Sequence, residues 1–352
     1  MTASKTYPVP ENILQSTHLT ASQYDEMYKQ SVEQPEAFWA EHASMLEWYQ
    51  KPTKIKNTMF GENDVSIKWF EDGELNASYN CIDRHLADNA TKVAFHWEGD
   101  SPEDSQDITY QQVHYEVCKL ANALKEMGVA KGDRVAIYMP MVPEAVFPML
   151  AVARLGAVHS VVFGGFAAHE LATRIDDCHP KVVVAASCGI EPARQVPYKP
   201  LLDNAIAQAK FKPDHCLVLE REEHPYDLEP GRDTDYAAAV WAHMEAGTKV
   251  PCVPVAATDP LYILYTSGTT GQPKGVVRDN GGHMGALLYS MKALYGIEPG
   301  EVFWAASDVG WVVGHSYICY GPLVHGNTTV VFEGKPVGTP DAGTFGRVIS
   351  EH

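Results

Sequence analysis

One glycine-rich stretch combines hydroxyl, glycine and lysine residues in an order that could bind phosphate. From position 266 to position 275 it runs Thr-Ser-Gly-Thr-Thr-Gly-Gln-Pro-Lys-Gly. Glycine has no Cβ and accepts positive φ, so the backbone can approach an anion closely. Backbone N–H groups and hydroxyls donate to phosphate oxygens, and a lysine adds a mobile positive charge. The predicted phosphate-binding residues are Thr266, Ser267, Gly268, Thr269, Thr270, Gly271 and Lys274.

This stretch does not satisfy the P-loop pattern GxxxxGK[ST]. Counting from Gly268, Pro273 stands where the second glycine belongs, and Gly275 stands where Ser or Thr would hold Mg²⁺. The order instead resembles [ST]SGTTGxPKG, the phosphate loop of the adenylate-forming enzymes, which include the acyl-CoA synthetases. A Gly/Ser-rich surface turn would share the spacing but not this order of hydroxyls, proline and lysine. The resemblance implies ATP, with Mg²⁺ in the substrate complex, and coenzyme A as co-substrate.

A second motif, Val-Val-Phe-Gly-Gly-Phe at 161–166, places a double glycine at the C-terminal end of an expected strand. On its own it fits a tight turn as well as the ligand-binding edge of an open α/β sheet. In acetyl- and propionyl-CoA synthetases the matching stretch lines the tunnel for the pantetheine arm, which implies coenzyme A contacts for Phe163, Gly164 and Gly165. Arg194 falls where the family contacts the phosphates of coenzyme A. Glu191, however, stands where many relatives have another basic residue.

A third motif, Asp-Val-Gly-Trp-Val-Val-Gly-His, lies at an expected turn between a strand and a helix. Trp311, Val312 and Val313 at such a turn indicate the wall of a small apolar pocket, with core packing as the alternative. The resemblance implies that this pocket holds the carboxylate substrate. Val313 stands where acetate-activating relatives commonly have Thr and propionate-activating relatives have Val, which favours propionate over acetate. Lys274 and His315 are the two candidates for catalysis, and His315 either polarises the carboxylate or only bonds to the backbone.

Hydrophobic periodicity predicts the elements that position these motifs. The apolar run 261–265 is a buried strand that leads into the glycine-rich loop. Strands at 134–139, 158–163, 181–186 and 215–219 alternate with helices at 144–155, 167–177 and 201–209, after a helix at 109–128. This alternation predicts an α/β fold with parallel β-sheets flanked by helices. The resemblance implies the layered αβαβα arrangement of the large N-terminal domain of adenylate-forming enzymes.

The remaining elements are less regular. We predict helices on both sides of Pro35, at 80–88, 235–246, 284–295 and 341–352, strands at 65–70 and 328–332, a strand ending at Ser307 and a helix from His315. Asn280 is expected to cap the helix 284–295. Residues 98–107, which are acidic and contain proline, are expected to form a solvated loop or hairpin tip.

The first part of the chain resembles the N-terminal extension of short-chain acyl-CoA synthetases in its phrases KNTMF, SIKWFEDGELN and CIDRHL. We therefore expect an extension at 1–88 and an incomplete AMP-binding domain at 89–352. Family members continue beyond this length into their adenine-binding and magnesium-binding residues, so no metal ligand is expected here. The chain is expected to be an N-terminal fragment with negligible ligase activity of its own. The alternative is a non-catalytic nucleotide- or acyl-binding module.

The composition excludes several classes of protein. Hydrophobic residues make up 45% of the chain and charged residues 20%, as in ordinary globular proteins. The formal net charge of -18 argues against broad nucleic-acid or anionic-membrane surfaces, because both need a basic patch. The seven cysteines never form CxxC and indicate reduced thiols. No segment has the apolar length of a membrane span, so we predict a cytoplasmic protein that binds small molecules.

Overall fold

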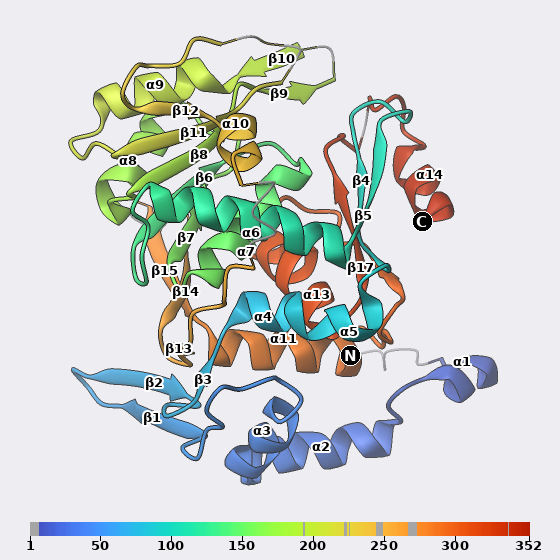
Figure 1. Ribbon diagram of the computed structural model, residues 1–352. Helices are drawn as coiled ribbons and strands as arrows, with labels where there is room; N and C mark the ends of the chain where they lie inside the picture. Colours follow the sequence, from blue (N-terminus) through green and yellow to red (C-terminus); the bar gives the residue numbers. More distant parts are fainter. Residues whose placement is uncertain are drawn as a thin grey trace, which may run out of the picture.

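The computed structural model shows two larger β-sheets with helices around them and a smaller N-terminal part beneath (Figure 1). The structure describes residues 7–192, 194–221, 224, 226–243, 249–266, 273–336 and 338–352. The mixed α/β fold expected from the sequence is confirmed, and the strands and helices alternate along the middle of the chain.

The larger sheet has seven strands in the order β12-β11-β8-β6-β7-β14-β15. Their bounds are β6 Arg134–Tyr138, β7 Val158–Val161, β8 Val182–Ala186, β11 His215–Leu219, β12 Asp233–Asp235, β14 Pro260–Thr266 and β15 Lys274–Asp279. All neighbours are parallel except β14 and β15, which form an antiparallel hairpin at the edge. The expected parallel sheet is confirmed, and β15 adds one antiparallel strand at its edge, where the sequence predicted no strand.

Helices cover both faces of this sheet. One face packs against α6 Tyr110–Glu126, α7 Pro143–Arg154 and α10 Tyr236–Trp241, and the other against α8 Ala168–Cys178 and α9 Tyr198–Gln208. The side chains of β6 alternate between the two cores, with Val135 and Ile137 on one face and Tyr138 on the other. The expected alternation of strands and helices thus buries both faces of the parallel part. A short hairpin of β9 Cys188–Glu191 and β10 Arg194–Pro197 follows β8.

Helix α6 shows how local sequence sets an element boundary. The Thr109 hydroxyl accepts a bond from the Gln112 backbone N–H, and the Gln112 side chain accepts one from the Thr109 N–H. This capping box fixes the start of the helix at the predicted residue.

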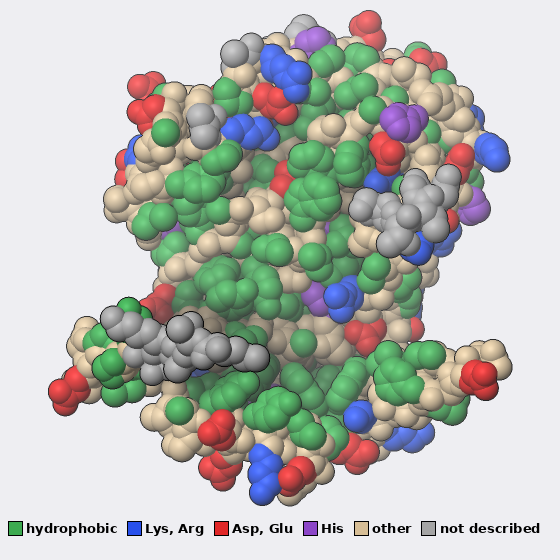
Figure 2. All heavy atoms as spheres, turned by 180° about the vertical axis from the view of Figure 1, so that it is seen from behind, with side chains coloured by type: hydrophobic (Ala, Val, Ile, Leu, Met, Phe, Trp, Pro, Cys, Tyr) green, Lys and Arg blue, Asp and Glu red, His purple; other side chains and the backbone are tan. Residues whose placement is uncertain are grey.

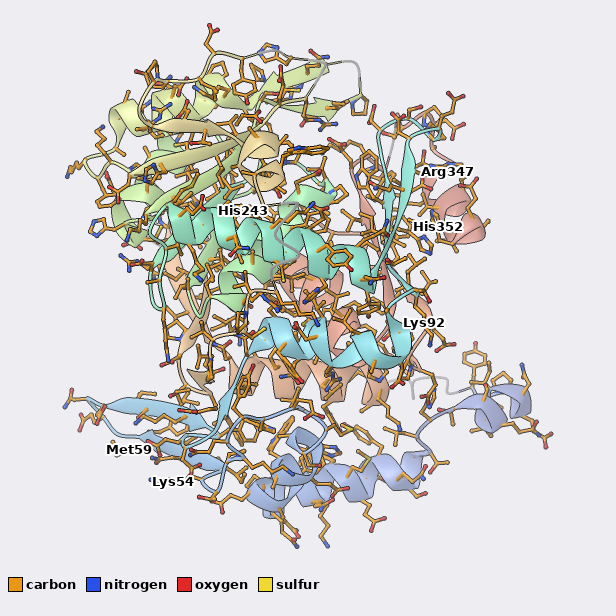
Figure 3. All side chains as sticks on the ribbon, viewed as in Figure 1. Lys54, Met59, Lys92, His243, Arg347 and His352 are labelled. Atoms are coloured by element: carbon orange, nitrogen blue, oxygen red, sulfur yellow. The ribbon has the colours of Figure 1, made fainter. Side chains whose placement is uncertain are left out.

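The smaller sheet has the order β16-β17-β4-β5. Its strands are β4 Val93–Glu98, β5 Ser105–Thr109, β16 Val302–Phe303 and β17 Thr328–Phe332. The expected hairpin tip between β4 and β5 is present, but the expected solvation of the whole segment is wrong at Glu98, which is buried. Its carboxylate lies 2.8 Å from Arg347 and 2.7 Å from His352, both labelled in Figure 3. These contacts hold the C-terminal helix α14 Thr344–Glu351 against the sheet.

The N-terminal part packs under the main body. It contains α1 Glu11–Ser16, α2 Ala21–Glu33, α3 Pro35–Ala43, the hairpin of β1 Lys56–Phe60 and β2 Val65–Trp69, and then α4 Ala77–Cys81, a 3-10 turn Asp83–His85 and α5 Leu86–Asn89. The short strands β3 Glu74–Leu75 and β13 Val255–Ala256 pair with each other. The predicted helix break at Pro35 is confirmed. Phe38 of α3 packs edge-on against Tyr289 of helix α11 Gly281–Ala293, with ring centroids 5.5 Å apart.

Three boundary predictions are wrong. Asn280 does not cap α11, because its side-chain amide donates to the Asp259 carbonyl, and the Asp279 carboxylate accepts the His283 N–H instead. The strand expected to end at Ser307 is the two-residue β16, and the helix expected from His315 begins earlier. It comprises α12 Val312–Gly314, a π-helix His315–Tyr320 and α13 Gly321–His325.

None of the helices in the described part of the chain combines the length and apolar character that crossing a bilayer requires.

Candidate active site

The sequence motifs meet at one edge of the larger sheet, beyond the carboxyl ends of β7 and β14. These strands are parallel neighbours, with Tyr262 paired to His159. Phe163 lies four residues after His159, and Thr266 lies four residues after Tyr262. Both residues therefore lie at the same end of the two strands. This is the edge at which open α/β sheets bind ligands.

The ends of the predicted phosphate loop are described, but its middle is not. Thr266, the last residue of β14, pairs with Lys274, the first residue of β15, and both are exposed. Thr266 and Lys274 are therefore the last described pair at this end of the β14–β15 ladder. The predicted residues Ser267, Gly268, Thr269, Thr270 and Gly271 lie outside the described residues.

The double-glycine motif contacts the predicted acyl-pocket motif. The Phe163 ring lies 5.3 Å from the Trp311 ring, and the Phe166 ring lies 6.2 Å from it. A Cβ added at Gly310 would lie 2.8 Å from Phe163 Cα, so only glycine permits this approach. Two motifs about 150 positions apart in the sequence are thus packed together, at the end of the sheet where Thr266 pairs with Lys274.

Gly164 has a packing reason of its own. A Cβ at this position would lie 2.1 Å from the Tyr198 hydroxyl oxygen. Tyr198 is buried and stacks on Tyr138 at 4.9 Å, and the Tyr138 hydroxyl donates to the Phe166 carbonyl. The missing side chain of Gly164 therefore makes room for a tyrosine, whatever else it permits. At Gly165 a Cβ would meet the Phe163 ring at 2.4 Å.

Arg194 lies on the β9–β10 hairpin, where it pairs with Glu191 across the turn. Its guanidinium Nε donates to a Glu191 carboxylate oxygen at 2.8 Å, and its side chain is 71% exposed. The base of this hairpin is close to the double-glycine motif, because Gly189 and Gly164 both pack on Tyr198. Glu191, which stands where many relatives have a basic residue, therefore forms an ion pair with the Arg194 guanidinium.

The expected acyl-pocket residues Trp311, Val312 and Val313 are each about half exposed. Their turn is tightly built, since a Cβ at Gly314 would lie 1.9 Å from the Asp308 carbonyl oxygen. Seen from behind, the middle of the molecule carries a broad band of apolar side chains with few charges (Figure 2). A cavity of about 780 Å³ lies elsewhere, at the opposite end of the β14–β15 hairpin.

His315 is fully buried and serves the turn rather than the open edge. Its Nδ1 lies 3.1 Å from the Trp311 carbonyl oxygen, and because a carbonyl only accepts, Nδ1 carries the proton. Burial lowers the pKa of His315 to about 4, so the imidazole is neutral at neutral pH. Its Nε2 has no hydrogen-bond partner among the described residues. Of the two alternatives for His315, the geometry favours the bond to the backbone.

Sequence reasoning missed the residues that support this edge. Tyr138 and Tyr198 stack beneath the double glycine, and the Arg174 guanidinium lies 4.5 Å from the Phe166 ring. No motif marks them, and their roles depend on contacts between separate elements. Among the described residues, no group of three or more His, Cys, Asp or Glu is placed to hold a metal ion.

Two family models match this chain. A family model described as "AMP-binding enzyme" matches residues 82–352. The chain belongs to this family. A second model, described as "Acetyl-coenzyme A synthetase N-terminus", matches residues 24–81. The AMP-binding match therefore includes all three motifs of the sheet edge.

Several AMP-binding relatives are similar over nearly the whole chain. An acetyl-coenzyme A synthetase of Pseudoalteromonas atlantica is 48% identical over 349 residues, which is 98% of this chain and 53% of the relative. The human mitochondrial acyl-CoA synthetase short-chain family member 3 is 50% identical over 335 residues, 95% of this chain and 48% of the relative. An acetyl-coenzyme A synthetase of Xanthobacter autotrophicus is 47% identical over 350 residues. The chain spans about half the length of these relatives.

Proposed function

We propose that this chain forms the first half of a ligase that activates a short-chain carboxylate with ATP and transfers the acyl group to coenzyme A. In the first step a carboxylate oxygen attacks the α-phosphate of ATP and pyrophosphate leaves. In the second step the thiol of coenzyme A attacks the acyl carbon and AMP leaves. Both steps depend on positioning and charge neutralisation, which a glycine-rich loop with a lysine supplies.

The observation that carries this proposal is the contact between Phe163 and Trp311 beside the hairpin of Thr266 and Lys274. It supports a common site for the phosphate loop, the coenzyme A contacts and the acyl pocket. Lys274 begins β15 at the exposed end of the hairpin, where a charge can reach the phosphates of ATP. His315 supports the pocket by fixing the Trp311 carbonyl.

Propionate is the proposed substrate and acetate the alternative. Val313 favours propionate, because an apolar branched side chain at the pocket wall cannot hydrogen-bond as Thr does. Acetate is favoured by relatives named acetyl-coenzyme A synthetase, at 47–48% identity. Because a methylene in an apolar pocket is worth roughly 1–3 kcal/mol, the preference should be about tenfold or more.

Carboxylate-dependent exchange of pyrophosphate into ATP tests the proposal. The assay uses a protein of the relatives' length that carries this chain as its first half. We expect exchange with propionate to exceed exchange with acetate, and Val313→Thr to lower that ratio about tenfold. Val65→Thr, an equal change at an exposed position of β2, serves as the control. An unchanged ratio in Val313→Thr would remove Val313 from the pocket, and no exchange with either acid would refute the ligase.

Residues 1–352 alone are proposed to release no AMP from propionate, ATP and coenzyme A. We further propose an extension at 1–88, an AMP-binding part at 89–352, and the cytoplasm as the compartment. All seven cysteines are buried thiols, which supports a reducing environment. The phosphate-loop, coenzyme A and pocket contacts are testable by mutation of the residues named above.

A further inference from the structure

A cysteine and a histidine one turn apart lie on the inner side of α6, away from the sheet edge described above. Cys118 Sγ lies 3.6 Å from His114 Nε2, since residues four apart on a helix share a face. The same His114 nitrogen lies 3.5 Å from an oxygen of Asp83. One imidazole nitrogen thus faces both a thiol and a carboxylate, which favours the imidazolium beside the sulfur and lowers the pKa of the thiol.

The carboxylate is itself held in place from the next helix. Arg154, the last residue of α7, donates two bonds to Asp83, at 2.7 and 2.8 Å, and is almost completely buried. Arg154 Nη2 also lies 3.5 Å from His114 Nε2, and Cys252 Sγ lies 3.8 Å from Asp83. The Arg154 guanidinium therefore lies beside both the carboxylate and the imidazole.

The direction of proton transfer follows from these contacts. Neutral His114 accepts at Nε2, and when it takes the thiol proton, the new N–H faces the thiolate and Asp83. Hydrogen bonds to Asp83 and Cys118 raise the pKa of His114 to about 9. Burial raises the pKa of the Cys118 thiol, but the bond to His114 and the charge of Arg154 outweigh it and lower that pKa below its ordinary value. Burial instead raises the pKa of Cys216 to about 12.

A cavity of about 610 Å³ gives small molecules access to this thiol. Its lining includes His114, Cys118, Lys119, His243 and Lys249, and Figure 3 labels His243 beside α6. Cys118 is only 4% exposed, so large reagents are excluded and the cavity is the route to its sulfur. Charges of both signs lie at the lining, because Glu116 also contributes to it and pairs with Lys119 at 2.6 Å.

We propose that Cys118 is a reactive thiol that small peroxides oxidise to the sulfenic acid. The Cys118 thiolate attacks one peroxide oxygen, so an S–O bond forms and the O–O bond breaks. The sulfur is oxidised and the peroxide is reduced. The leaving hydroxide takes the proton from the His114 imidazolium, which gives water and neutral His114.

The test is site-resolved labelling of the 352-residue chain. The reduced chain is treated at pH 7 with limiting hydrogen peroxide and dimedone, and each cysteine peptide is quantified by mass spectrometry. We expect at least tenfold more adduct at Cys118 than at Cys216. The rate of iodoacetamide labelling at Cys118 should also titrate below the ordinary thiol pKa of about 8.5. Equal labelling of Cys118 and Cys216, or an iodoacetamide titration at or above about 8.5, overturns the proposal.

Two variants locate the cause of the reactivity. Cys118→Ser should remove the dimedone adduct without increasing it at other cysteines. His114→Gln should slow labelling of Cys118 about tenfold and leave Cys216 unchanged. An unchanged Cys118 rate in a folded His114→Gln chain overturns the role of the imidazole. If His114→Gln unfolds the chain, Cys216 becomes labelled as well. The comparison of Cys118 with Cys216 in the wild-type chain then decides the proposal.

Discussion

Replacing Gly164 by alanine tests whether this position is glycine because of its packing on Tyr198 or because a ligand needs the room. The added Cβ would lie 2.1 Å from the Tyr198 hydroxyl oxygen and 2.8 Å from the adjoining ring carbon. Tyr198 cannot swing away freely, because it is buried and stacked on Tyr138. Overpacking of this kind costs roughly 1–3 kcal/mol. With a urea dependence of about 3 kcal/mol per M, a loss of 2 kcal/mol lowers the unfolding midpoint by about 0.7 M.

The assay is urea unfolding of the ligand-free chain, followed by tryptophan fluorescence. Gly346→Ala is the matched control, since nothing lies within 4 Å of its added Cβ and alanine favours a helix interior by up to about 1 kcal/mol. The double variant Gly164→Ala/Tyr198→Phe should recover part of the loss, because it removes the closest atom. If Gly164→Ala unfolds at the wild-type midpoint, the packing on Tyr198 is wrong, and room for a ligand is the better reason for this glycine.

Three further predictions concern buried charge. Burial lowers the pKa of His315 to about 4, so its contribution to stability is lost as pH falls from about 6.5 through 4. The unfolding free-energy difference between wild type and His315→Asn should therefore shrink by about 1–2 kcal/mol between pH 7 and pH 5. Asp83→Asn leaves Arg154 without a charged partner and should cost about 3–5 kcal/mol in urea unfolding. Glu98→Gln should weaken the docking of α14, which hydrogen exchange of residues 344–351 will detect as faster exchange.

Each of these predictions has an outcome that contradicts it. If the difference in unfolding free energy between wild type and His315→Asn does not change with pH, the imidazole takes up a proton as readily in the folded chain as in the unfolded chain. Asp83→Asn is compared with Glu71→Gln, which breaks an exposed ion pair with Lys68 and should leave the midpoint unchanged. Equal effects of these two changes would contradict the burial of the Asp83–Arg154 pair. Unchanged exchange in α14 would show that Phe345 and Val348 alone hold the helix.

The central strands and helices could be predicted because their signals are local. In β6 to β8 and in α6 to α9, apolar periodicity and turn residues agree with the tertiary structure. The edge strand β15 could not be predicted. Its residues Val276, Val277 and Arg278 are all exposed, and they follow the glycine-rich stretch without an alternating apolar and polar pattern. An edge strand is determined by its neighbour, and β14 is that neighbour.

The site itself could be predicted only in part. The motifs named its residues, but the contact between Phe163 and Trp311 joins positions that no sequence periodicity connects. Glu98 resembled a surface acid because its partners Arg347 and His352 lie about 250 positions away. The cap expected at Asn280 failed because the competing Asp259 carbonyl is brought there by the fold.

The most direct test of the proposed site is propionate-dependent pyrophosphate exchange by Lys274→Met in a protein that carries this chain at the relatives' length. Lys68→Met, a change at an exposed lysine of β2, is the control. Loss of a preorganised charge at the reacting phosphates costs on the order of 10²–10³ in rate. We predict a fall of at least about a hundredfold for Lys274→Met and none for Lys68→Met. Exchange at the wild-type rate in Lys274→Met would contradict the assignment of this hairpin to ATP.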